Sequence, residues 1–230
     1  MLVTERWLDF DIDRNQVCHH LGYEDNYKLP ARILSLIDEY IENAHYLIEP
    51  SFSYVIRNIE LVHGPIVVIE DSLTLKSRVI ARLLEQCYKA AIFLVTIGKH
   101  LEETAYQLAE DGLVLQATVL DAIGSGAAER VADLVQDKIR ETANTQGLVT
   151  SPRFSPGYCD WDVDQQKTIF QAVDGDALGI YLTERYLMIP RKSISGIIGI
   201  GPSNSDVENY NPCKTCKKYD CLGRRENLRK

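Results

Sequence analysis

The chain has 230 residues, a formal charge of −8 at pH 7, 45% hydrophobic residues and 25% charged residues. This length suits one large domain or two small ones, and the composition excludes collagen-like, coiled-coil and wholly disordered proteins. No apolar run approaches the ~18 residues of a membrane span, and the first residues lack the features of a secretory signal. We therefore expect a cytoplasmic protein with no membrane segment.

Charge is divided unevenly along the chain. Residues 191–230 hold nine Lys or Arg and four Asp or Glu, a net of +5, so residues 1–190 carry −13. We predict a folded domain over residues 1–202, followed by a basic, cysteine-containing tail over residues 203–230.

Apolar periodicity and turn residues predict the elements of the first half. Pro30 suits the first turn of a helix, and Pro50 and Gly98 end elements. The expected helices cover residues 14–21, 30–48, 77–87 and 100–110, and the expected strands cover residues 52–62, 66–69 and 91–97.

The longest periodic stretch predicts a helix over residues 113–142. Gly124 and Gly126 interrupt its apolar stripe. Each glycine costs ~1 kcal/mol against Ala inside a helix, so we expect a break or a close backbone contact there. A phosphate-binding loop is the weaker alternative, because Glu129 stands where the third glycine of that motif belongs.

The second half of the chain is predicted to contain shorter elements and more loop. Residues 145–163 read as loop, residues 164–173 as a short helix, and residues 177–201 as short strands and turns. Helices and strands are interspersed without regular alternation, which indicates an α+β or irregular α/β fold.

Three cysteines cluster in the basic tail. Cys213 and Cys216 form a C-x2-C pair and Cys221 follows. Such spacing suits zinc or an iron–sulfur cluster, with Cys159, a non-cysteine group or a partner's residue as the fourth ligand. The alternative is a tail whose cysteines are incidental.

Common catalytic motifs do not occur in the sequence. It lacks the Gly-x4-Gly-Lys-Ser/Thr, His-Glu-x-x-His and Gly-x-Ser-x-Gly patterns. The adjacent His19 and His20 are read as an exposed helix face.

Three segments in order carry a family resemblance. Residues 127–140 form an Ala-Glu helix ending in a basic residue, residues 153–159 read Arg-Phe-Ser-Pro-Gly-Tyr-Cys, and residues 182–196 contain Leu-Thr-Glu, Met-Ile-Pro and Ser-Ile-Ser-Gly. Together they resemble the activation domain of cobalamin-dependent methionine synthase. The resemblance is clear over residues 127–200 and vague over residues 1–126.

The resemblance implies an α+β fold with helices packed around a twisted, mainly antiparallel sheet. It also implies binding of S-adenosylmethionine and rescue of cobalamin that has slipped to Co(II). The chain lacks the Asp-x-His-x-x-Gly cobalamin signature, so we expect a free-standing subunit. Its partners would be a cobalamin-binding methionine synthase, or another corrinoid protein, and an electron donor such as flavodoxin or ferredoxin.

The same resemblance implies the ligand-binding residues. Arg153 would hold the ligand's carboxylate through its two-pronged guanidinium, and Glu129 would face the sulfonium or amino group. Pro156 and Gly157 would let the backbone approach the ligand, beside Tyr158. Glu184, Ser193 and Ser195 also lie in matching motifs, but they equally suit strand-end hydrogen bonds.

The sequence departs from the family pattern at several points. Cys159 replaces a proline that often follows Gly-Tyr, and Tyr210 is a distant substitute for a pair of tyrosines. Asp9, Asp11 and Asp13 compete for the role of an early aspartate. The cysteine tail is an addition.

Two other functions stay open at this point. One is a reductive activator of a different corrinoid methyltransferase system, with an iron–sulfur cluster bound by the tail. The other is a non-catalytic binding module with a zinc-stabilised tail. Binding of nucleic acid is disfavoured, because the main part of the chain is acidic.

Overall fold

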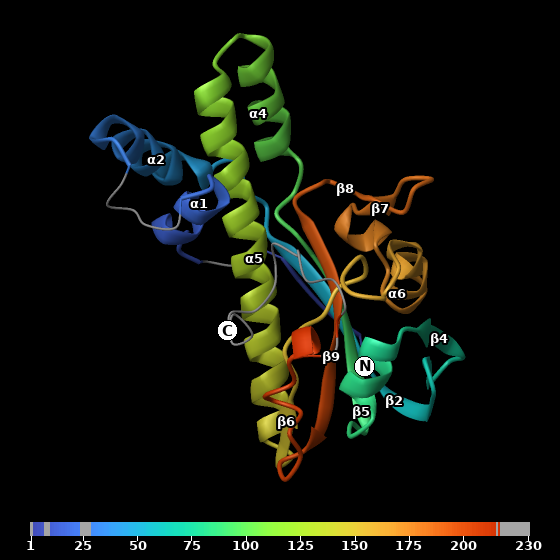
Figure 1. Cartoon of the computed structure of the whole chain (residues 1–230). Coiled ribbons are helices and arrows are strands. Elements are labelled where there is room, and N and C mark those ends of the chain that lie inside the picture. The colour runs from blue at the N-terminus through green and yellow to red at the C-terminus, as the bar shows by residue number, and fades with distance from the viewer. Residues whose placement is uncertain (1, 7–9, 24–28, 215, 217–230) are drawn as a thin grey trace.

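The computed structural model describes residues 2–6, 10–23, 29–214 and 216 (Figure 1). The helices are α1 (Arg14–His20), α2 (Ala31–Ala44), α3 (Arg78–Leu84), α4 (His100–Glu110), α5 (Val114–Asn144) and α6 (Gln166–Ala172). The strands are β1 (Leu2–Arg6), β2 (Ser51–His63), β3 (Ile66–Ile69), β4 (Leu73–Lys76), β5 (Lys89–Thr96), β6 (Leu148–Thr150), β7 (Tyr181–Leu182), β8 (Met188–Ile189) and β9 (Ser193–Pro202). Short 3₁₀ turns cover Val163–Gln165, Asp176–Leu178 and Pro212–Lys214.

One antiparallel sheet organises the molecule. Its strand order is β4-β3-β2-β5-β9-β6, and β1 pairs with the first part of β2. All of its strand pairs are antiparallel, and β7 and β8 form a separate small pair. The predicted α+β class with helices around an antiparallel sheet is confirmed.

Both faces of the sheet are covered. Successive side chains of a strand point to opposite faces, so Phe93 and Val95 of β5 pack under α1, α2, α4 and α5. Ile92 and Leu94 lie on the other face, in the cluster that includes α3 and α6. Figure 1 shows α5 running along the sheet, with α1 and α2 on one side of the molecule and α6 on the other. The long apolar run in β5 reflects this two-sided burial.

Helix α5 continues unbroken through both of its glycines. A Cβ added at Gly124 would lie 2.6 Å from Cδ2 of Leu101 in α4 and 3.3 Å from Cγ and Cε of Lys192. Gly124 therefore permits a close approach of the neighbouring elements, which is the second of the two outcomes expected. Because both glycines lie inside a continuous helix, the phosphate-loop alternative is wrong.

Most predicted elements are present with shifted ends, and three strands were missed: β1, β4 and β6, the last of which lies in a stretch expected to be loop. β1 carries no distinctive pattern of its own and is defined by its pairing with β2. β4 follows a turn in which Asp71 and Ser72 adopt positive φ angles of 67° and 63°, without the glycine that usually marks such a turn. Within the described ranges, no helix combines the length and apolar character needed to cross a membrane.

Candidate functional site

The candidate site lies between helix α5 and the segment that follows β6. Phe154 in this segment exchanges backbone hydrogen bonds with Ile197 of β9, at 3.0 and 2.8 Å. The side chain of Phe154 is buried with Trp161 on the α3–α6 face. Its neighbour Arg153 reaches instead to α5, as alternation along an extended segment requires.

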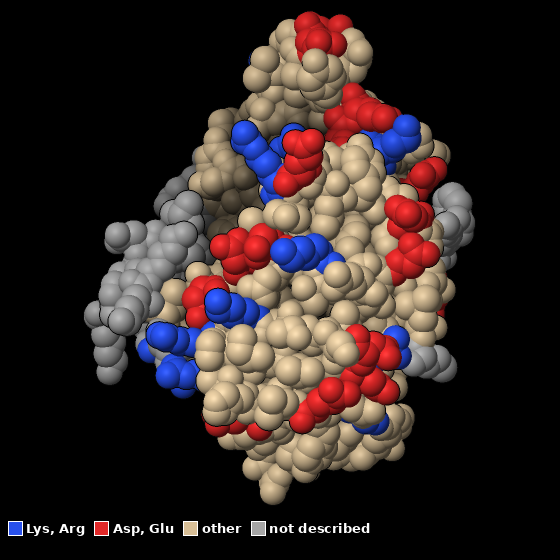
Figure 2. Space-filling model, turned by 90° about the vertical axis from the view of Figure 1, so that its right-hand side faces the viewer, with Lys and Arg blue, Asp and Glu red and all other residues tan. Residues whose placement is uncertain are grey.

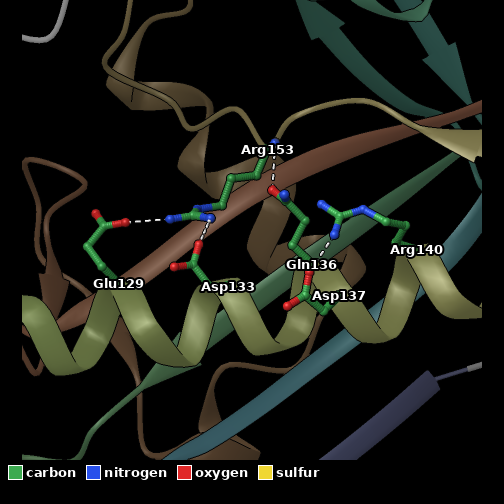
Figure 3. Close-up of polar contacts among 6 residues, drawn as sticks. All are labelled: Glu129, Asp133, Gln136, Asp137, Arg140 and Arg153. Atoms are coloured by element: carbon green, nitrogen blue, oxygen red, sulfur yellow. Dashed lines mark hydrogen bonds and ion pairs between the residues drawn. The ribbon is translucent and has the colours of Figure 1, made fainter. Parts of the chain in front are cut away.

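Arg153 is bound by three side chains of α5 (Figure 3). Its Nη2 donates to Oε2 of Glu129 at 2.5 Å, and its Nη1 donates to Oδ1 of Asp133. Its backbone N–H donates to Oε1 of Gln136 at 3.0 Å. These positions are three and four residues apart, so they share one face of the helix. Both prongs of the guanidinium are thus held by carboxylates.

The charges of this cluster are coupled. The Arg153 side chain is 21% exposed, against 45% for Glu129 and 37% for Asp133. Burial alone would lower the pKa of Arg153, but the Asp133 and Glu129 carboxylates outweigh burial and raise it. One cation and two anions leave the cluster with a formal charge of −1, which favours a ligand of net positive charge.

Helix α1 forms the opposite wall of an open pocket of about 440 Å³. We call this the α1–α5 pocket. Its lining residues come from α1, α5 and the segment after β6: Asn15, Gln16, His19, His20, Glu129, Asp133 and Arg153. The Asp13 side chain caps α1 by accepting from the N–H of Asn15 at 2.8 Å, and Arg14 pairs with Asp38 of α2 at 3.1 Å.

Histidine adds a polar but uncharged group to this wall. Burial lowers the pKa of His20, despite the opposing effect of the Glu129 charge. The imidazole is therefore neutral at pH 7, and the pocket keeps its excess of negative charge. The arrangement suits a small ligand that carries both a carboxylate and positive charges.

The Pro156–Tyr158 stretch forms a tight turn outside the lining of this pocket. Gly157 has a φ of 94°, and its N–H donates to the carbonyl of Trp161 at 2.7 Å. Pro156 is buried and Tyr158 is 58% exposed. The turn follows soon after Arg153, so it fixes where the segment after β6 leaves the pocket.

Glu184, Ser193 and Ser195 are not gathered with Arg153. Ser195 is buried and donates to Oε1 of Gln166 in α6 at 2.8 Å, on the face opposite α5. Ser193 donates to the carbonyl of Pro190 at 2.7 Å, and Glu184 is exposed between β7 and β8. A ligand role for these residues stays a prediction.

The structure places two of the three early aspartates that were candidates for a ligand role. Asp13 is the cap of α1, Asp11 is exposed, and Asp9 lies outside the described residues. The pocket residues that the sequence reasoning missed are Asp133 and those of α1. Asp133 lies one helical turn after Glu129, and this spacing alone could have predicted that both carboxylates share one face of the helix. His19 and His20 lie on an exposed helix face, as expected, and both also line the pocket.

The described cysteines do not form the metal centre that their spacing predicted. Among the described residues, no group of three or more His, Cys, Asp or Glu side chains is arranged to hold a metal ion. Cys213 and Cys216 are described, and Cys221 lies outside the described part of the chain. Burial raises the pKa of the Cys159 thiol to about 12, and the nearby Cys216 and Cys213 act in the same direction.

Comparisons with known proteins place this geometry in a family. A family model described as "Vitamin B12 dependent methionine synthase, activation domain" matches residues 80–217, which include Arg153, Glu129 and Asp133. No curated protein matches the chain. A solved structure described as the MetH reactivation domain bound to AdoHcy has a TM-score of 0.67 and 14% identity, covering 88% of this chain and 80% of that one. At this identity, the likeness shows a shared fold.

Proposed function

The chain belongs to the family of vitamin B12-dependent methionine synthase activation domains, and we propose that it binds S-adenosylmethionine in the α1–α5 pocket. In this proposal it supports reductive methylation of Co(II) cobalamin held by a separate methionine synthase in the cytoplasm.

The observation that carries the proposal is the Arg153–Glu129–Asp133 cluster. S-adenosylmethionine has a carboxylate, an ammonium group and a sulfonium group, and its net charge is +1 near neutral pH. The cluster offers one guanidinium for the carboxylate and two carboxylates for the cationic groups. Its formal charge of −1 complements that of the ligand.

Ligand binding on this arrangement is an exchange of ion pairs. The Arg153 prongs are occupied by Glu129 and Asp133, so the ligand carboxylate replaces at least one of these protein carboxylates. The displaced carboxylate then meets the ammonium or sulfonium group of the same ligand. Because each broken pair is replaced, the exchange leaves no partly buried charge without a partner.

The protein's contribution to methyl transfer is to position the ligand. The partner's corrinoid, once reduced, supplies the nucleophile that takes the methyl group, and S-adenosylhomocysteine leaves. One electron from a flavodoxin-like or ferredoxin-like donor is consumed in the reduction. Holding the amino-acid end of the ligand at Arg153 and Glu129 fixes where the sulfonium carbon stands for in-line attack.

The charges on one face of the molecule give little support to a nucleic-acid-binding module there. Figure 2 shows Lys and Arg interspersed with Asp and Glu on the face where α3 and α6 lie. A nucleic-acid interface instead gathers positive charge into a patch or stripe.

Replacing Glu129 by Gln tests the ligand's placement by calorimetric titration. The variant keeps the side-chain shape and removes the charge, so affinity for S-adenosylmethionine should fall by about tenfold, or about 1.4 kcal/mol. A parallel titration with S-adenosylhomocysteine, which lacks the sulfonium charge, locates the contact. Loss for both ligands assigns Glu129 to the ammonium group, and loss for S-adenosylmethionine alone assigns it to the sulfonium.

Glu141→Gln is the matched control for this titration. Glu141 is an exposed residue of the same helix and does not line the pocket. Its variant should bind both ligands as the wild type does. Unchanged affinity for S-adenosylmethionine in Glu129→Gln would contradict the proposed placement, and so would the absence of binding to the wild type.

A further inference from the structure

Helix α1 presents a polar face to the α1–α5 pocket, opposite the ion cluster around Arg153. Gln16, His19 and His20 are three and four residues apart on α1 or adjacent, so they share this face, and all three line the pocket. Helix α1 lies beside α5 (Figure 1). The two walls therefore differ in chemistry. One has charged groups, and the other has amide and imidazole groups.

The other residues of α1 hold this polar face in place. Val17 and Cys18 are 0% exposed and pack into the core between α1 and its neighbours. Arg14 donates to both carboxylate oxygens of Asp38 in α2, at 3.2 and 3.1 Å. Helix α1 is thus anchored by apolar packing and an ion pair. The polar side chains of the pocket face are not needed to position the helix.

The polar face of α1 lies against Gly126 of α5, three residues before Glu129. A Cβ added at Gly126 would lie 3.7 Å from Cγ2 of Val17, 3.9 Å from Cβ of Gln16 and 4.0 Å from Cδ2 of His20. These are ordinary van der Waals distances, so the packing does not require the glycine, although glycine is unfavourable inside a helix. Its missing side chain leaves space beside Gln16 and His20, about 4.5 Å along α5 from Glu129.

The polar groups of Gln16 and His20 are available to a ligand. In the part of the chain that the structure describes, neither side chain has a hydrogen-bond partner. Burial lowers the pKa of His20, so its ring is neutral at pH 7 and has one donor and one acceptor nitrogen. A glutamine amide can bind N6 and N7 of adenine through two hydrogen bonds, and imidazole rings stack on bases.

We propose that Gln16 and His20 form an adenosine subsite, in which Gln16 binds the 6-amino group and N7 of the purine and His20 stacks on its ring. This inference rests on the proposed function, because a ligand held by its carboxylate at Arg153 turns its nucleoside end to the rest of the pocket. The helix rises about 10 Å between Asp133 and Gly126. The ligand then lies along α5, with its sulfonium group near Glu129.

The subsite selects a purine that has an amino group at position 6. The adenine edge offers one donor at N6 and one acceptor at N7, which match the oxygen and the NH₂ of one amide. Hypoxanthine has an oxygen at position 6, so its edge offers two acceptors. One of them would then face the amide oxygen of Gln16 or lose its partner.

Calorimetric titration with S-adenosylhomocysteine and S-inosylhomocysteine tests the role of Gln16. The two probes differ at position 6 of the purine, where the inosyl form has oxygen. The wild type should bind the adenosyl form about tenfold more tightly. Gln16→Leu should bind the adenosyl form about tenfold more weakly than the wild type does, and it should no longer distinguish the two probes. A purely structural role for Gln16 would instead weaken both equally.

The role of His20 has a different signature in the same titrations. Stacking depends little on which base is present, so His20→Ala should lower the affinity for both probes by about tenfold and keep the preference for adenine. His20→Phe retains an aromatic ring and should restore most of the affinity. Unchanged affinity in His20→Ala would overturn the stacking role.

Gln107→Leu is the matched control for these variants. Gln107 is an exposed glutamine of α4 that does not line the α1–α5 pocket, and its variant should bind both probes as the wild type does. Far-UV circular dichroism checks the fold of each variant. A tenfold preference retained in Gln16→Leu, or no preference in the wild type, would overturn the adenosine subsite and leave the proposed function standing. No binding of S-adenosylmethionine or either probe by the wild type would overturn both.

Discussion

Replacing Arg153 by Ala should lower the affinity for S-adenosylmethionine by on the order of 100-fold, a loss of about 2.7 kcal/mol. The variant removes the partner of the ligand carboxylate. It also leaves Glu129 and Asp133, one helical turn apart on α5, without the cation that binds them both.

Two further variants separate the effect of the two-pronged guanidinium from that of charge. Arg153→Lys keeps a cation but cannot bind a carboxylate through two parallel bonds, so its affinity should lie between those of the wild type and Arg153→Ala. Arg140→Ala removes an arginine that pairs with Asp137 on the same helix at 2.6 Å, outside the pocket lining (Figure 3). This exposed pair should be dispensable, and calorimetry should give wild-type affinity.

One calorimetric result would contradict the prediction for Arg153. If Arg153→Ala binds S-adenosylmethionine as tightly as Arg140→Ala does, the ligand carboxylate is held elsewhere. Circular dichroism of each variant shows whether a loss of binding comes from the site or from the fold.

Replacing Trp161 by Ala should lower the free energy of unfolding by about 3–5 kcal/mol. Trp161 is 1% exposed, is stacked near Phe154 with ring centroids 6.4 Å apart, and donates from Nε1 to Oε1 of Gln165 at 3.3 Å. Its removal opens a cavity on the α3–α6 face. The same residue closes the turn that follows Arg153, because its carbonyl accepts from Gly157.

Urea unfolding followed by far-UV circular dichroism measures this loss. Tyr158→Ala is the matched control from the same turn, since its ring is 58% exposed and its truncation should change stability by no more than about 0.5 kcal/mol. A loss below about 1 kcal/mol for Trp161→Ala would contradict the role assigned to its packing.

The elements that the sequence predicted best are those with long periodic patterns of apolar residues. Helix α5 was expected over residues 113–142 and covers Val114–Asn144, because its apolar stripe continues past both glycines. β1 has no comparable pattern, and β4 follows a turn whose positive φ angles fall on Asp71 and Ser72. Such elements depend on pairing with neighbours, which a single sequence does not display.

The candidate site was predicted in part for a similar reason. Arg153 and Glu129 were named through the family resemblance, and the structure joins them by a hydrogen bond of 2.5 Å. The helical spacing from Glu129 was enough to predict Asp133 as a site residue. The contribution of α1 to the pocket could not be predicted, because its short sequence pattern does not show which helix it packs against.

The most direct test of the proposed function is transfer of a labelled methyl group. The protein is incubated anaerobically with a cobalamin-loaded methionine synthase lacking its own activation domain, a reduced flavodoxin or ferredoxin, and methyl-labelled S-adenosylmethionine. We predict labelled corrinoid and S-adenosylhomocysteine in equal amounts, with little of either when Arg153→Ala replaces the wild type. Labelled corrinoid no greater than in a reaction without the protein would contradict the account.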